Sequence, residues 1–299
     1  MVEPAKNLNN QTVVIKSEKV SSPWLEAWKG FKKNKLAVVG ACIVLFFIIL
    51  AIFAPIIAPS GFNEHEYGKT LQPPSSEHWF GTDDFGRDIL SRVIFGARVS
   101  LWVGFFSVLG SIVIGCALGI IAGYYGKWVD TIISRFFDIM LAFPSILLAI
   151  AIVAVLGPSL QNALIAIAII NVPNFGRLIR SKVLSVKQEE YIMAAKALGM
   201  NDSRILFKHI LPNSIAPIIV QGTLAIATAI IECAALGFLG LGAQPPTAEW
   251  GKMLADSRQY LIQAPWTMIF PGLAIMLTVL GFNLMGDGLR DALDPKMKN

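Results

Sequence analysis

Charged residues are scarce in this chain. Asp, Glu, Lys and Arg make up 15% of its 299 residues, whereas soluble globular domains carry about 25%. This scarcity excludes an ordinary soluble domain. Because the chain is 55% hydrophobic, with a mean hydropathy of +0.61, we expect most of it to lie in a membrane.

Cysteine and histidine are also rare, with three of each. The cysteines, Cys42, Cys116 and Cys233, all fall within apolar segments, so we expect small buried hydrophobic side chains and no disulfides. The histidines share no ligand spacing with one another or with cysteine; they are His65, His78 and His209. The sequence therefore predicts no metal site.

Motifs for energy-converting chemistry are missing as well. A phosphate-binding loop needs Gly-Lys followed by Ser or Thr, but Gly126-Lys127 precedes Trp128 and Gly251-Lys252 precedes Met253. There is no nucleophile elbow and no His-Glu zinc motif. The chain is thus expected not to be an enzyme, and any active transport must take its energy from a partner or an ion gradient.

Long apolar runs are what the chain has in abundance. About 20 helical residues cross the roughly 30 Å of hydrocarbon in a bilayer, and only helices do so economically in a chain of this kind. The sequence predicts an all-α multi-pass membrane protein with six spans, near 36–58, 99–122, 137–157, 160–178, 215–240 and 266–286. The fourth is the weakest, since Asn171, Pro173 and Asn174 interrupt it.

Basic residues are distributed unevenly between the two sides of the membrane. The segments 1–35, 123–136, 176–214 and 287–299 hold 19 of the 25 Lys and Arg residues, and 59–98 and 241–265 hold the other 6. Because basic residues stay in the cytoplasm, both termini are expected there. An even number of spans agrees with this orientation.

Four regions follow from this topology. We expect a cytoplasmic tail over 1–35, a first span with its extracytoplasmic loop over 36–98, a main membrane domain over 99–288, and a second cytoplasmic tail over 289–299. The positive charge is explained by membrane orientation, so no nucleic-acid partner is expected.

The first outside loop carries a dense motif, GTDDFGRDILSRVIFGARVSL, at residues 81–101. Its glycines and aspartates indicate a turn. The residues that follow have an apolar face, made of Ile89, Leu90, Val93, Ile94 and Ala97. The pattern predicts a helix that lies along the membrane surface before the second span begins.

A polar segment, EYIMAAKALGMNDSRILFKHILP at residues 190–212, interrupts the apolar runs. Helical spacing gives it one apolar stripe, made of Tyr191, Ala194, Ala195 and Leu198. Gly199 follows where a left-handed conformation would end the helix, and Asn201 and Asp202 are good caps for a second helix. The segment is therefore predicted to be two short helices joined by a turn, on the cytoplasmic side.

Three interpretations of this segment compete. It matches part of the spacing of a DNA-binding helix-turn-helix, but it is too short for a third helix and is tied to the membrane at both ends. It could also be a plain surface connector. The third interpretation is a docking element that a cytoplasmic protein binds.

The segment resembles the EAA loop of binding-protein-dependent ABC importer permeases. That pattern is Glu-Ala-Ala, three residues, Gly, nine residues, Ile-x-Leu-Pro. The matching positions, within a loop spanning 187–212, are Ala194, Ala195, Gly199, Leu211 and Pro212. Two positions depart from the pattern, since Met193 stands for the glutamate and His209 for the isoleucine.

The outside loop resembles the C-type subunit of the dipeptide/oligopeptide/nickel branch of that family. The matching residues are Gly81, Thr82, Asp83, Gly86, Arg87, Asp88, Ser91, Arg92, Gly96, Arg98, Ser100 and Leu101. The stretch ECAALGFLGLGAQPPTAEWG, at 232–251, is also similar to that branch. The resemblance covers about residues 20–295.

This resemblance implies a type I ABC importer permease fold, with six transmembrane helices and a cytoplasmic coupling helix in the EAA loop. It also implies a prokaryotic inner or plasma membrane and three kinds of partner: a B-type permease, two ATPases and an extracytoplasmic solute-binding protein. ATP and Mg²⁺ would bind the ATPases, so no cofactor is expected on this chain. Dipeptides or oligopeptides are the implied solutes, with nickel complexes and glutathione left open.

An ion-coupled secondary transporter is the rival class. It would need ionisable groups inside the membrane, and the candidates are Asp138 and Glu232. Asp138 lies near Arg135, which favours a local ion pair. Glu232 either lines the translocation path or forms a hydrogen bond with a neighbouring helix.

Overall fold

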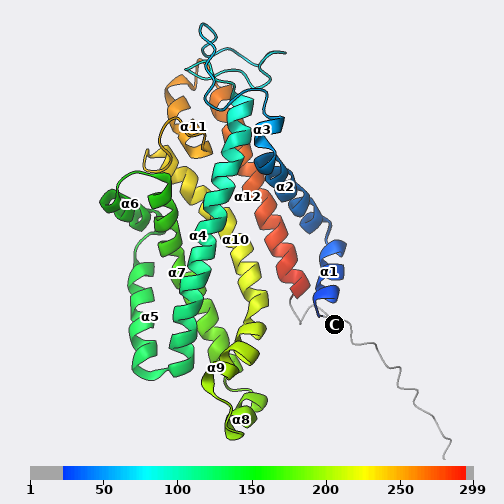
Figure 1. The fold of residues 1–299 in the computed structure, drawn as a ribbon, viewed down its shortest axis with the longest axis vertical. Helices are drawn as coiled ribbons and strands as arrows, with labels where there is room; N and C mark the ends of the chain where they lie inside the picture. The colour runs from blue at the N-terminus through cyan, green and yellow to red at the C-terminus, as the bar shows by residue number, and fades with distance from the viewer. Residues whose placement is uncertain (1–22, 294–299) are drawn as a thin grey trace, which may run out of the picture.

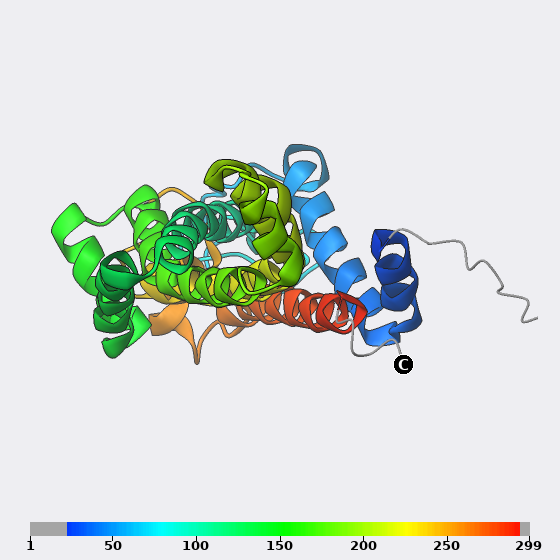
Figure 2. The same cartoon turned by 90° about the horizontal axis from the view of Figure 1, so that it is seen from below.

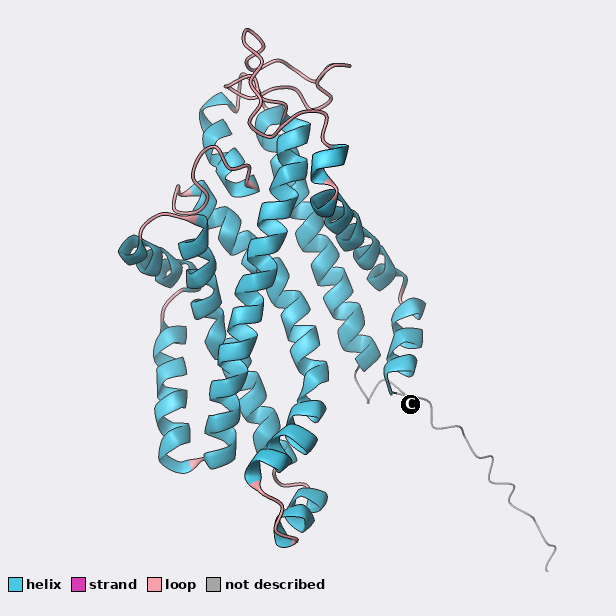
Figure 3. Ribbon diagram, viewed as in Figure 1, coloured by secondary structure: helices cyan, strands magenta, loops and turns pink. Residues whose placement is uncertain are grey.

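The structure, a computed structural model, describes residues 23–293. Within that range it is helical, apart from turns and one isolated bridge between Thr82 and Asp88. Long helices run side by side along the molecule, and most of the loops gather at one end (Figures 1 and 3). Residues 1–22 of the predicted tail 1–35, and 294–299 of the tail 289–299, lie outside the described residues.

The first span is formed by α2 (Lys35–Ile52), with a short α3 (Ala54–Ile57) after it. Asn34 separates α2 from α1 (Pro23–Lys33), and its side chain accepts hydrogen bonds from the backbone N–H groups of Leu36 and Ala37. This is an N-cap, which satisfies donors that the first turn of a helix leaves free. α1 and α2 both pack against α12 (Trp266–Leu293).

The second span is longer than predicted. α4 runs without interruption over Ile89–Tyr125, so the residues expected to form a separate surface helix are its first turns, and that prediction is wrong. The reason is that Asp88 caps the helix and no residue after it breaks the hydrogen-bond ladder. Small residues at Gly115, Gly119 and Gly123 bring α4 close to α7 (Leu160–Val186).

The third span is broken, whereas the sequence predicts one span near 137–157. α5 (Lys127–Ala142) and α6 (Ser145–Leu156) meet at an angle of 96°. Pro144 lies between them and has no N–H to continue the helix, and the preceding Phe143 is extended, as a residue before proline prefers. In α6, 12 residues rise only about 18 Å, too little to cross a bilayer alone.

The fourth span is one helix, α7, although Pro173 lies inside it. α10 (Leu211–Phe238) and α12 form the fifth and sixth spans. Among the described residues, five helices are long and apolar enough to cross a membrane, and six spans result if α5 and α6 count as one. Seen from below, α5 and α6 lie on one flank and α1 and α2 on the other (Figure 2).

Two groups of short elements lie beyond the long helices. α8 (Glu190–Ala197), α9 (Asp202–Ile205) and the π-helix η1 (Leu206–Ile210) connect α7 to α10. α11 (Trp250–Ser257) and the 3₁₀ helix η2 (Arg258–Tyr260) connect α10 to α12. The two groups lie at opposite ends of the bundle (Figure 1).

Candidate functional site

The segment α8–α9 forms a helical hairpin, as the sequence predicts. The turn is made at Gly199, whose φ is +79°, a conformation that side chains bearing a Cβ adopt only at a cost. The N–H of Gly199 bonds to the carbonyl of Lys196 at 2.9 Å, and that of Met200 to the carbonyl of Ala195 at 3.0 Å. Asn201 then caps α9 by accepting the N–H of Arg204.

The hairpin is held against the ends of the long helices. Ile192, Ile205 and Ile210 are fully buried, in a cluster with residues of α4 and α7. The Tyr124 hydroxyl donates to Asp202, and the Lys187 ammonium donates to the Tyr124 carbonyl at 2.6 Å. A force on the hairpin would therefore reach α4, α7 and α10 directly.

Large apolar side chains are exposed on the hairpin and on η1, which follows it. Leu198 is 88% exposed and Phe207, in η1, 72%, and Tyr191 and Met193 of α8 are also exposed. We call these four residues the hairpin patch. An exposed apolar patch at the tip of a polar segment is typical of a docking surface.

The five residues of the EAA pattern divide between the two sides. Ala194, Gly199 and Pro212 are exposed, Leu211 is half-buried, and Ala195 is buried. The predicted stripe of Tyr191, Ala194, Ala195 and Leu198 is therefore exposed except at Ala195. Ala195 packs inward together with Ile192, three positions earlier, because residues i and i+3 share a helix face.

The hairpin is also continuous with a span. α9 passes through η1 into α10 without a break, so Asp202–Phe238 behaves as one long helical stretch. Pro212, the second residue of α10, follows directly on the π turn of η1. A local π turn is a common place for a proline inside a continuous helix.

At the opposite end, the motif of residues 81–92 folds the outer loop. The carboxylate of Asp83 accepts the backbone N–H groups of Phe85 and Arg87 through Oδ1, each at 2.9 Å. Its Oδ2 lies 2.7 Å from Nε of Arg87 and 3.5 Å from Nε of Arg92. One carboxylate thus joins a turn to two buried guanidinium groups.

The other motif residues fix the start of α4. Asp88 caps the helix at the N–H of Ser91 and also lies 3.1 Å from Nδ1 of His78. The hydroxyl of Ser91 accepts the N–H of Ser60 at 3.1 Å, and that of Thr82 accepts the N–H of Gln72 at 2.9 Å.

Two glycines of the motif adopt left-handed conformations. φ is +76° at Gly81 and +72° at Gly86, and a Cβ at either position would collide with a backbone carbonyl. Together with these two turns, the hydrogen bonds and ion pairs of the motif fold the loop and fix the start of α4. The sequence alone did not predict these contacts.

Glu232 lies inside the bundle, 7% exposed, and accepts a hydrogen bond of 3.0 Å from Nδ2 of Asn171 on α7. This is the hydrogen bond expected by one of the two interpretations above; path lining stays a prediction. Asp138 lies 2.6 Å from Arg177 of α7 and 4.0 Å from Arg135, so the stronger partner is on another helix.

Sequence reasoning missed the contacts of Glu249 and Trp250. Glu249 is 1% exposed and caps α11 at the N–H groups of Gly251 and Lys252, each at 2.8 Å. Burial raises the pKa of this carboxyl to about 7. The indole of Trp250 donates to the carbonyl of Val93 at 3.0 Å, which ties α11 to α4.

Metal-ligating side chains come close together at one place among the described residues, namely Glu66, Glu77 and His78. Lys69 already forms ion pairs with both glutamates. The ammonium group of Lys69 therefore balances the negative charge of Glu66 and Glu77.

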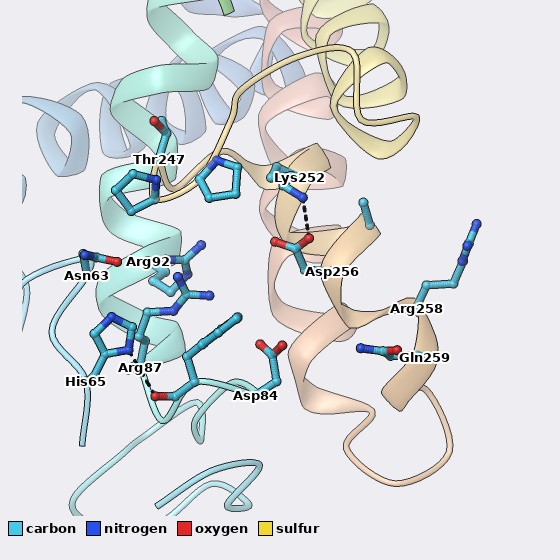
Figure 4. A pocket seen from close by; sticks show the side chains of 14 residues that line it. Asn63, His65, Asp84, Arg87, Arg92, Thr247, Lys252, Asp256, Arg258 and Gln259 are labelled. Atoms are coloured by element: carbon cyan, nitrogen blue, oxygen red, sulfur yellow. Dashed lines mark hydrogen bonds and ion pairs between the residues drawn. The ribbon is translucent and has the colours of Figure 1, made fainter. Parts of the chain in front are cut away.

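Two of the cavities on the described residues have linings that mix polar and apolar groups. One, of about 490 Å³, lies at the end of the bundle opposite the hairpin, between the loop that contains residues 63–87 and α11 (Figure 4). The other, of about 530 Å³, lies near the hairpin between α7, α10 and α12, and its polar lining includes Lys182, Gln221 and Arg290. Neither was expected from the sequence, since each joins residues far apart in the chain.

The long apolar helices, the hairpin at one end of the bundle and the folded loop motif at the other are together typical of a transport permease. Residues 115–299 match the family described as "Binding-protein-dependent transport system inner membrane component". The chain belongs to this family, whose members are permease subunits and not enzymes. Residues 22–74 also match the "N-terminal TM domain of oligopeptide transport permease C".

Two curated relatives are similar over nearly the whole chain. The dipeptide transport system permease protein DppC of Alkalihalophilus pseudofirmus is 69% identical over 93% of this chain and 91% of its own length. The glutathione transport system permease protein GsiD of Pectobacterium atrosepticum is 49% identical over 96% of this chain and 95% of its own.

Solved structures share the fold. The inward-facing MetNI methionine ABC transporter matches with a TM-score of 0.54 at 20% identity, over 69% of this chain and 98% of that one. An amino acid ABC transporter crystallised with histidines gives 0.53 at 16% identity, over 66% and 92%. The chain therefore has the fold of an ABC importer permease.

Proposed function

We propose that this permease imports dipeptides or short oligopeptides. The observation that carries the proposal is the 69% identity to a dipeptide permease over almost the full length of both chains. The bundle would form the translocation path together with a second, B-type permease. An extracytoplasmic solute-binding protein would deliver the peptide.

Energy would enter through the hairpin. Two cytoplasmic ATPases, which hold ATP and Mg²⁺, would bind the two EAA loops of the permease pair. The hairpin patch supports this, because it offers exposed apolar side chains at the tip of a segment fixed to three spans. The sequence adds that the chain has no phosphate-binding loop of its own.

The mechanism would be a rigid-body movement. When the ATPases close, they would displace α8 and α9, and η1 would pass the displacement into α10 because the helical backbone has no break there. The anchors on Tyr124 and Lys187 would carry α4 and α7 along. The spans would then tilt between inward-facing and outward-facing arrangements.

The inner cavity would face the path in the inward-facing state. Its polar groups lie on α7, α10 and α12, in a bundle whose other faces are largely apolar. Lys182 and Arg290 could meet the carboxylate of a departing peptide, and Gln221 its amide groups.

Glutathione and nickel complexes are the alternative solutes, the first because of the GsiD relatives. The deciding experiment is uptake of labelled dipeptide by the purified complex in ATP-loaded proteoliposomes. We expect unlabelled dipeptides to compete strongly, and glutathione and nickel complexes weakly. Uptake of glutathione or nickel in preference to dipeptides would contradict the proposed solute.

A further inference from the structure

The outer cavity has a wall built from both extracytoplasmic connections. Asn63, His65 and Phe85 come from the first, and Thr247 and Gln259 from the second, with Arg87 and Arg92 at the start of α4 between them (Figure 4). The segments that line the cavity lie at the end of the bundle opposite the hairpin (Figure 1).

Positive charge is in excess around this cavity. The cations that line it are Arg87, Arg92, Lys252 and Arg258, and the carboxylates are Asp84 and Asp256. Asp256 is committed to Lys252 at 2.6 Å. Burial raises the pKa of the Asp84 carboxyl.

The two arginines share one further carboxylate. Asp83 lies 2.7 Å from Nε of Arg87 but 3.5 Å from Nε of Arg92, and Arg92, 3% exposed, also donates to the carbonyl of Phe62 at 3.0 Å. A buried guanidinium that is incompletely paired is costly, and a carboxylate bound by its fork would be stabilised. The exposed ring of Phe85, 4.6 Å from the Arg87 guanidinium, supplies an apolar rim beside this charge.

We propose that this cavity is the docking point for an acidic side chain of the extracytoplasmic solute-binding protein. This rests on the proposed function, since it needs a delivering protein. A protein side chain fits better than the transported solute, because the lining comes from the outer connections and the entrance of α4 and not from the spans near Glu232. Exposed aromatic and cationic groups side by side are also typical of protein interfaces.

The test uses the complete transporter in nanodiscs and the purified, peptide-loaded binding protein, whose Kd is measured at several NaCl concentrations. For the wild type, we expect affinity to fall as salt rises. Gln259→Glu places a negative charge at the cavity and should weaken binding about tenfold, and Arg258→Gln about threefold. Asp256→Asn frees Lys252 and should tighten binding, which general damage to the fold would not do.

Ser76→Glu is the matched control, because it adds the same charge to an exposed position of the outer loop that does not line the cavity. It should bind like the wild type. Wild-type affinity in both Gln259→Glu and Arg258→Gln, or equal weakening by Ser76→Glu, would overturn the proposal.

A second arm distinguishes the solute as occupant. If the cavity received the peptide's own carboxylate, Gln259→Glu would leave binding-protein affinity intact and would abolish the preference of uptake for free peptides over their C-terminal amides. That result would overturn the proposal and leave the transport function standing. A wild-type complex that neither binds the delivering protein nor takes up peptide would overturn both.

Discussion

Five polar side chains among the described residues satisfy backbone N–H groups at the beginnings of helices. The capping residues of α2, α4, α7, α9 and α11 are Asn34, Asp88, Ser159, Asn201 and Glu249. A cap contributes roughly 1 kcal/mol, and each of these lies where a span meets a connection or within a connection itself. The caps at Asp88 and Glu249 are buried, at 4% and 1% exposure.

The buried carboxyl of Glu249 predicts a dependence of stability on pH. Its pKa is about 7 in the folded protein, against 4.5 for an unperturbed carboxyl. Above pH 4.5 the unfolded chain loses its proton while the folded one keeps it, so stability is full below that pH and is lost as pH rises toward 7. The total loss is of the order of 3 kcal/mol.

Thermal unfolding of the purified protein, followed between pH 4.5 and 7.5, measures this. We expect the midpoint to fall with rising pH, and Glu249→Gln to flatten the fall. Glu64→Gln, at an exposed position of the outer loop, should keep the wild-type dependence. An unchanged pH dependence in Glu249→Gln would rule out this assignment.

Glu232 predicts a contrast between two substitutions. Gln keeps an oxygen that can accept from Asn171, so Glu232→Gln should unfold at the wild-type temperature, whereas Glu232→Leu removes the acceptor and should cost roughly 1–3 kcal/mol. If Glu232 also lines the path, Glu232→Gln will change the relative uptake of peptides of different charge. If Glu232→Gln leaves the uptake of all these peptides unchanged, Glu232 has only a structural role.

At the scale of elements, the hairpin can be tested by two separate changes, one to its exposed surface and one to its turn. Leu198→Asp puts a charge into the hairpin patch, and Gly199→Val forces a Cβ into a left-handed turn at a cost of about 1–2 kcal/mol. Neither change touches a span, so we expect insertion and pairing with the second permease to persist. Capture of the ATPases and peptide-stimulated ATP hydrolysis should be lost.

Lys196→Gln is the control for these variants. Lys196 is exposed and lies 5.1 Å from the ring of Tyr124, so its loss should be mild. Ala195→Asp is a poor probe of docking, because Ala195 is buried and the change would disturb the hairpin itself. Co-purification of the ATPases at wild-type levels with Leu198→Asp and Gly199→Val would support a plain connector instead.

The hairpin was predictable because its signals are local. A glycine, a cap and helical periodicity lie within a dozen residues, and the structure has the turn at Gly199 and the cap at Asn201. The shapes of the third span and of α4 could not be predicted in this way. The apolar run over 137–157 indicates a span but not the bend at Pro144, because hydropathy carries no information on the direction of a helix. α4 begins earlier than predicted because Asp88 caps it.

The pairs between helices were beyond sequence reasoning for another reason. Asp138 and Arg177, and Asp130 and Arg180, join α5 to α7 across 39 and 50 positions, and only the packing of the helices brings them together. The nearer cation, Arg135, was the natural expectation for Asp138. The outer cavity is unpredictable in the same way.

At the scale of the whole molecule, the two ends of the bundle have different tasks. One end carries the hairpin, and the other carries the folded outer motif, α11 and the cationic cavity (Figures 1 and 4). The distribution of 19 and 6 basic residues predicts that the hairpin end is cytoplasmic. The spans, with α10 continuous from the hairpin, connect the two.

Cysteine labelling tests this orientation. In sealed cells, Ser76→Cys and Thr247→Cys should react with an impermeant thiol reagent, and Asn201→Cys should react only after the membrane is opened. Cys116 and Cys233 are buried, as predicted, but Cys42 is exposed on the side of α2, so the prediction of a buried side chain is wrong there. The labelling therefore uses a background in which Cys42 is replaced by Ser. Labelling of Asn201→Cys from outside would contradict the orientation.

We propose that ATP hydrolysis by partner subunits, and not an ion gradient, drives this permease. The most direct measurement is dipeptide uptake into proteoliposomes that contain the whole complex, with ATP and with an ionophore varied independently. We predict that uptake continues when the proton gradient is collapsed and stops when ATP is depleted. Uptake that stops with the ionophore and continues without ATP would contradict the account.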